Sequence, residues 1–164
     1  MHRLTRPRLS RRSALLLGTA AVLFNTTAMA AEPPINTLKT GVFGGRTDTA
    51  INGYDTVAYF TVGKPVKGQD NLATDWRGAK WKFSSQANLD LFKSNPEKYA
   101  PQYGGYCAYG VTQGYLVKVE PDQFTLREGK LYLNYDAEVQ AKWLKDPAGY
   151  ILDGDTKFQA LLKK

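Results

Sequence analysis

The stretch KWKFSSQANLDLF, residues 80–92, changes from the residue spacing of a strand to that of a helix. Residues 80–83 alternate lysine with an aromatic residue, which is typical of a half-buried strand. Ser84 or Ser85 then suits the N-cap of a helix, because a serine hydroxyl accepts a hydrogen bond from a free backbone N–H. The apolar residues that follow lie at helical spacing: Ala87, Leu89, Leu91 and Phe92.

Similar local patterns on both sides of this stretch predict more elements. Residues 57–62, VAYFTV, are rich in β-branched and aromatic residues and predict a strand that ends at Gly63-Lys64-Pro65. Residues 75–78 predict a turn before the strand at 80–83. Asn95-Pro96 ends the helix and opens a short second one through Tyr99.

The C-terminal third carries a hairpin pattern followed by helices. Residues 124–126 and 131–133 flank a turn with Gly129. Asp136 suits the N-cap of the next helix, and apolar residues near residue 160 predict a last one. Strands and helices do not alternate as regular βαβ units. The expected fold class is therefore α+β, with a small antiparallel sheet and packed helices.

The front of the chain has the pattern of an export signal. Five arginines and no acid precede an apolar run at residues 14–24, and Ala28-Met29-Ala30 forms a small-x-small cleavage site. Residues 10–16, SRRSALL, are similar to the twin-arginine motif. We expect a signal peptide over residues 1–30, cleavage near Ala30 and a periplasmic mature protein.

The rest of the chain is long enough for one domain. Residues 31–48 lack clear periodicity and predict an extended, at best partly ordered N-terminal arm that leads into a domain over residues 49–164. The chain has 22 basic and 15 acidic residues, and removal of 1–30 leaves 17 and 15. This near balance gives no reason to expect nucleic acid as a partner. The mature chain also has no apolar run long enough to span a membrane.

Composition excludes several kinds of site after the signal. His2, Met1 and Met29 all lie within residues 1–30, and Cys107 is the one cysteine of the chain. A four-ligand Cys/His zinc site in one chain is excluded, as are blue-copper sites and haem held by His or Met. A Cys-His dyad and a Ser-His-Asp triad are excluded as well.

Several separated motifs, in this order, resemble exported bacterial proteins with a YHS domain. They are NGYDTVAYF (52–60), WKFSS (81–85), NPEKYAPQYGGYCA (95–108) and GKLYLNY (129–135). The resemblance implies a small domain related to metal-handling modules. Where metal-binding relatives hold cysteines, this sequence holds Ala58, Ser84 or Ser85, and residues 86–89. The resemblance thus implies a retained scaffold without that ligand set, while a cysteine in the segment of Cys107 is common in the exported branch.

The residues leave three interpretations of Cys107 open. It can be a small buried core residue, flanked by glycines and tyrosines. It can anchor a ligand, either a transition metal such as copper or zinc, for which a thiolate is a soft donor, or a small organic molecule or anion in a tyrosine-lined pocket. It can also be a reactive thiol of a small redox or other enzyme, since an unpaired cysteine in an oxidising compartment suggests reactivity or intermolecular pairing.

Our sequence-based hypothesis is a periplasmic protein that binds a ligand, most simply a transition-metal ion at Cys107, rather than an enzyme. A homodimer could hold one ion between two Cys107 thiolates. The weaker candidates for ligand binding near Cys107 are Tyr54, Asp55, Tyr103 and Tyr106.

Overall fold

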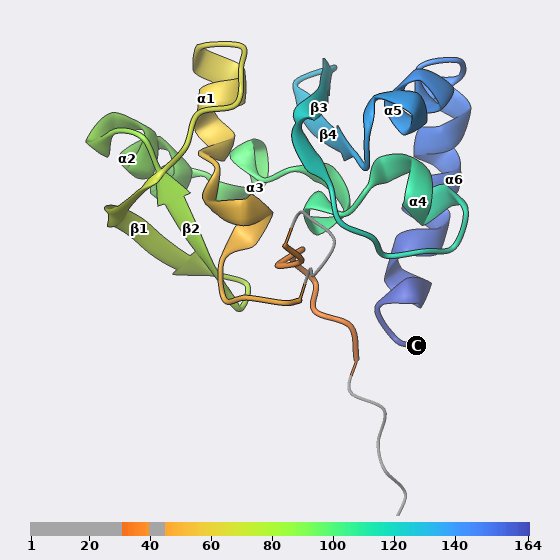
Figure 1. Cartoon of the computed structure of the whole chain (residues 1–164), viewed down its shortest axis with the longest axis horizontal. Coiled ribbons are helices and arrows are strands. Elements are labelled where there is room, and N and C mark those ends of the chain that lie inside the picture. Colours follow the sequence, from red (N-terminus) through yellow and green to blue (C-terminus); the bar gives the residue numbers. More distant parts are fainter. Residues whose placement is uncertain (1–30, 40–44) are drawn as a thin grey trace, which may run out of the picture.

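Two β-hairpins, each with its own helices, lie side by side in the computed structural model, which describes residues 31–39 and 45–164 (Figure 1). Each hairpin is a separate two-stranded antiparallel sheet. The first group comprises η1 (Ala50–Gly53), α1 (Thr56–Thr61), β1 (Gln69–Trp76), β2 (Ala79–Phe83), α2 (Gln86–Ser94) and α3 (Pro96–Tyr99). The second comprises η2 (Gln102–Gly105), α4 (Ala108–Thr112), β3 (Glu120–Arg127), β4 (Lys130–Asn134), α5 (Ala137–Trp143) and α6 (Pro147–Leu161). The α+β prediction is confirmed, with two small sheets in place of one.

The first hairpin packs on α2 through aromatic rings. The ring of Phe92 lies 5.1 Å from Trp81 and 5.0 Å from Phe83, measured between centroids. Leu89 and Phe92 form the buried face of α2, whereas Leu91 is 38% exposed. The predicted helix and the strand at 80–83 are therefore confirmed. The inclusion of Leu91 and Ala87 in the apolar face was wrong, because the buried positions lie three residues apart at 89 and 92.

Residues 56–61 form the helix α1 and not the predicted strand. The carboxylate of Asp55 accepts hydrogen bonds from the backbone N–H groups of Val57 and Ala58, at 2.9 and 3.2 Å. This N-cap fixes the first turn, and Val57, Ala58 and Tyr59 are then buried on all sides. Capping and burial outweigh the strand preference of β-branched and aromatic residues.

Other local predictions are confirmed at their capping residues. Ser85 caps α2 and Asp136 caps α5, each through its side-chain oxygen. Asn95, predicted only to end α2 before Pro96, also caps α3 through its side-chain oxygen. The turn of the second hairpin contains Gly129 in a left-handed conformation, with φ of 71°. The last helix begins as early as Pro147, and the polar strand β1 carries no alternation that could predict it.

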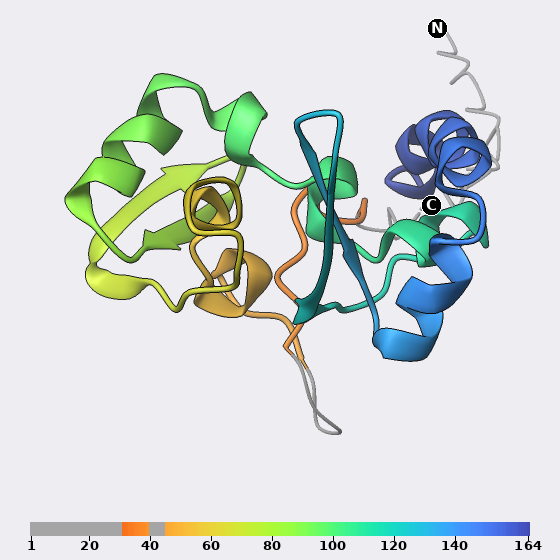
Figure 2. The ribbon, with the colours of Figure 1, turned by 90° about the horizontal axis from the view of Figure 1, so that it is seen from above.

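The described part of the N-terminal arm is docked between the two halves (Figure 2). Ile35, Asn36 and Thr37 are buried. The backbone N–H of Asn36 donates to the carbonyl of Gly104, and its side-chain amide donates to the carbonyl of Gly105, both at 2.9 Å. The predicted signal peptide falls on residues that lie outside those described. Among the described residues, no helix has the length and apolar character to cross a bilayer.

Candidate functional site

Cys107 lies in the junction between η2 and α4. The three residues Tyr103, Gly104 and Gly105 have φ of 55°, 60° and 83°, so the chain turns with left-handed backbone. A Cβ at Gly104 would collide with the carbonyl oxygen of Pro34 in the arm. Gly104 therefore serves the docking of the arm, since no side chain fits there between the two backbones.

The sulfur of Cys107 is the N-cap of the short helix α4. It accepts the backbone N–H of Gly110 at 3.3 Å and lies 3.8 Å from Oδ1 of Asn134, which also accepts the N–H of Tyr109 at 3.3 Å. Cys107 is 1% exposed, and burial raises the pKa of its thiol above the ordinary value. The side chain is thus held as a neutral thiol.

One wall of a pocket of about 300 Å³ is formed by Cys107. The pocket lies between α4, the loop that follows it, the end of β4 and α5. Tyr115 and Tyr135 are partly exposed at 65% and 38%, whereas Cys107 is buried. The lining residues are Cys107, Tyr109, Gly110, Gln113, Tyr115, Val117, Tyr135 and Val139.

The width of this pocket depends on Gly110. A Cβ at this position would lie 3.0 Å from Cγ2 of Val117 and 3.3 Å from the carbonyl oxygen of Tyr115. The absence of a side chain lets α4 approach the loop at 115–117. This approach brings Tyr115 and Val117 into one wall with Cys107.

Asp55 has no free oxygen for a ligand. Its Oδ2 accepts the N–H of Ser84 at 2.8 Å, the hydroxyl of Ser84 at 2.6 Å and the side-chain amide of Asn88 at 2.7 Å. With the two α1 caps, five donors converge on this buried carboxylate. Asp55 joins α1 to the β2–α2 junction and is separate from the Cys107 pocket.

The three tyrosines proposed beside Cys107 also have other partners. The hydroxyl of Tyr103 donates to Asp155 at 3.1 Å, and that of Tyr106 donates to the carbonyl of Pro33 at 3.0 Å. Tyr54 lies under the ammonium group of Lys67, 4.3 Å from the ring centroid. None of these hydroxyls is bonded to Cys107, so the structure does not assemble the five proposed residues into one site.

The donor set for a metal is poor in the described part of the chain. No group of three or more His, Cys, Asp or Glu residues lies close enough together there to hold an ion. At the positions where the resemblance places ligating cysteines, Ser84 and the α2 residue Asn88 are hydrogen-bonded to Asp55. Such a network of hydroxyl, amide and carboxylate groups does not fit a soft metal ion.

Burial of Cys107 also bears on the expected dimer. A linear ion between two Cys107 thiolates requires both sulfurs at the surface, and the residue is 1% exposed. The raised pKa of the thiol further disfavours the thiolate that such an ion needs.

A larger groove of about 760 Å³ lies elsewhere, between α3, η2 and α6. Its charged groups are already paired within the chain. Arg77 forms an ion pair with Glu97 at 2.8 Å, and Asp155 accepts the hydroxyl of Tyr103. We therefore place the candidate site at the Cys107 pocket.

The sequence analysis missed most of the residues that line this pocket. Tyr109, Tyr115 and Tyr135 come from three separate segments, and no local spacing relates them to Val139. Asn134 ends β4 and is fully buried beside Cys107, and no local pattern assigned it to the site. The available signal was the density of tyrosine, 10 residues in a chain of 164.

Fold and site together define a small α+β protein with an aromatic pocket beside a buried thiol that caps a helix. Residues 57–103 match the family model of the YHS domain, so the chain is a YHS domain-containing protein. No curated protein matches the chain in sequence, and no solved structure matches it. The match covers α1 to α3 and ends at Tyr103, so Cys107 and its pocket lie beyond it.

Proposed function

We propose that the protein is an exported, periplasmic ligand-binding protein whose site is the pocket beside Cys107. The ligand class is a small, uncharged, largely apolar molecule of aromatic character. The observation that carries this proposal is the composition of the pocket wall, where a neutral thiol, three tyrosines and two valines surround about 300 Å³. This volume lies at the lower end of the range of small-molecule sites.

Charge supports the choice of ligand class. None of the eight lining residues carries a formal charge. The ammonium group of Lys118 lies over the ring of Tyr135, 4.3 Å from the centroid, and is paired with Glu120. An ionic ligand would lose hydration in such a site without a partner of opposite charge. Tyrosine hydroxyls and the amide of Gln113 can still pair with one polar end of a ligand.

A transition metal at Cys107 is the rival within the same class of function. Its support is the YHS match, a domain often associated with metal binding. Against it, the pocket offers one soft donor, whose pKa is raised by burial. Binding is also favoured over thiol catalysis, because a nucleophilic cysteine needs a lowered pKa.

The test is a titration with the neutral fluorophore N-phenyl-1-naphthylamine, whose emission rises in apolar surroundings. We expect saturable binding at one molecule per chain. The variant Val139→Phe places a ring in the pocket and should weaken this binding at least tenfold. Val62→Phe is the matched control, because Val62 is 58% exposed and lies outside the pocket.

The same samples separate the two ligand classes. Alkylation of Cys107 by N-ethylmaleimide should slow as the fluorophore saturates the pocket, and this protection should be lost in Val139→Phe. The opposite result has two parts: the fluorophore does not slow the alkylation of Cys107, and Cu(I) or Zn²⁺ slows it both in wild type and in Val139→Phe. That result would overturn the proposal in favour of the metal.

A further inference from the structure

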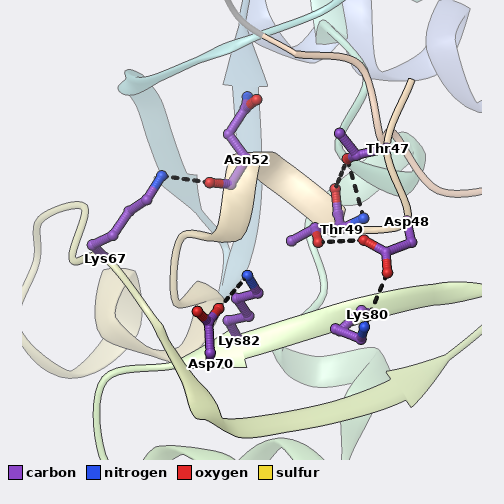
Figure 3. A network of polar contacts seen from close by, with 8 residues as sticks. All are labelled: Thr47, Asp48, Thr49, Asn52, Lys67, Asp70, Lys80 and Lys82. Atoms are coloured by element: carbon purple, nitrogen blue, oxygen red, sulfur yellow. Dashed lines mark hydrogen bonds and ion pairs between the residues drawn. The ribbon is translucent and has the colours of Figure 1, made fainter. Parts of the chain in front are cut away.

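A second pocket, unrelated to Cys107, is surrounded by lysines. It has a volume of about 410 Å³ and lies where the end of the arm and η1 face β2. Figure 3 draws all of its lining residues except Lys39. The lining residues are Lys39, Thr47, Thr49, Asn52, Lys67 and Lys82.

The backbone around Gly68 brings two of these lysines together. A Cβ at Gly68 would lie 2.5 Å from the carbonyl carbon of Lys82 and 2.6 Å from its Cβ. The segment that carries Lys67 can therefore lie directly against β2 because residue 68 has no side chain. The close approach places Lys67 and Lys82 in the same pocket wall.

A left-handed turn supplies the other wall. Ile51, Asn52 and Gly53 have φ of 49°, 53° and 74°, which is costly for the two residues that carry a Cβ. The turn presents the carbonyl of Asn52 to the ammonium group of Lys67 at 2.5 Å (Figure 3). The strained backbone is thus used to hold a lysine at the pocket.

Positive charge exceeds negative charge at this place. Lys82 is paired with Asp70 at 2.5 Å, and Asp70 is an exposed residue at the rim. Lys39 and Lys67 have no ion pair within the described residues. Burial and the neighbouring charge of Lys82 lower the pKa of Lys67. A bound anion reduces the repulsion between ammonium groups that lie close together.

We propose that this lysine pocket binds a small phosphate-bearing molecule. Three ammonium groups supply charge without directional restriction, and the hydroxyls of Thr47 and Thr49 line the same space. Ammonium donors suit the several acceptor oxygens of a phosphate, whereas the hydroxyls of Thr47 and Thr49 already donate to the carbonyl of Thr37 and to Asp48 and only shape the pocket. The proposal is independent of the ligand at Cys107, since the two pockets share no residue.

The probe is inorganic pyrophosphate, titrated by isothermal calorimetry at constant ionic strength. We expect one site per chain, with at least tenfold weaker binding in Lys67→Met and Lys39→Met. Methionine keeps the length of the side chain and removes the charge. Lys39 is exposed, so its variant tests the site even if Lys67→Met does not fold. The control Lys93→Met removes an exposed charge on α2, outside the pocket, and should change the affinity less than twofold.

A variant that gains affinity makes the test stricter. Asp70→Asn removes the carboxylate that competes for Lys82 and should tighten pyrophosphate binding about twofold to fivefold, as expected for loss of an exposed ion pair. Citrate is titrated in parallel to separate phosphates from carboxylates. Equal losses in Lys93→Met and Lys67→Met, no saturable binding, or tighter binding of citrate than of pyrophosphate would overturn the proposal.

Discussion

Oδ1 of Asn134 lies 3.8 Å from Sγ of Cys107, and both side chains are buried. The same oxygen accepts the N–H of Tyr109 at 3.3 Å, so Asn134 connects the end of β4 to the first turn of α4. This arrangement favours a protonated thiol, because a thiolate beside a carbonyl oxygen would place two acceptors together. Asn134 therefore both supports the start of α4 and keeps the thiol in the pocket wall protonated.

Loss of the Asn134 amide should destabilise the fold. In Asn134→Ala the buried N–H of Tyr109 loses its acceptor, which costs about 1–3 kcal/mol in the free energy of unfolding. Urea denaturation monitored by tryptophan fluorescence measures this. The control Asn71→Ala, at an exposed position of β1, should change stability by less than about 0.5 kcal/mol. Equal effects of the two substitutions would contradict the assigned role of Asn134.

The state of Cys107 predicts a specific pH dependence. Burial raises the pKa of the thiol above its ordinary value of 9.0, so the folded state holds the proton more tightly than the unfolded state. The resulting stability is fully present below pH 9 and is lost as the pH rises through the folded-state pKa. Wild type should therefore lose stability relative to Cys107→Ala above pH 9, when both are unfolded in urea over pH 7–10. The tyrosines titrate in both proteins and cancel. If the free energy of unfolding of wild type, relative to that of Cys107→Ala, stayed constant or increased above pH 9, the result would contradict a raised pKa of the thiol.

The sequence predicted those features that depend on residues adjacent along the chain. The caps at Ser85 and Asp136 follow from side-chain oxygens that act within three residues of themselves, and the turn at Gly129 follows from the absence of a side chain. The helix at 56–61 was missed because the Asp55 cap and the burial of Val57, Ala58 and Tyr59 override propensity. The pocket was missed because tertiary packing alone brings Tyr109 and Val139 to the same cavity.

Asp55 should matter for stability and not for ligand binding. In Asp55→Asn, an amide N–H₂ replaces one carboxylate oxygen and faces donors from Ser84 or from the start of α1. Several buried N–H and O–H groups then lose their acceptor, and we expect a loss of about 3 kcal/mol or more in the free energy of unfolding. Asp75→Asn, at an exposed position of β1, is the control. A stable Asp55→Asn protein that no longer binds N-phenyl-1-naphthylamine would contradict this separation of roles.

Gly104 should control the docking of the arm. Alanine at this position adds a Cβ that collides with Pro34, in addition to the strain of φ at 60°. Gly63→Ala has nearly the same strain, with φ of 67°, but nothing within 4 Å of the added Cβ. We expect Gly104→Ala to be the less stable variant and its arm to be cut faster by trypsin at Arg46. Similar cleavage rates in both variants would show that docking does not depend on Gly104.

The most direct test of the proposed function is native mass spectrometry of the chain isolated from its own organism. We predict one bound organic molecule per chain, retained in Val62→Phe and absent from Val139→Phe. A bare chain, or the added mass of copper or zinc that disappears in Cys107→Ala, would contradict the assignment of the pocket to an uncharged apolar ligand.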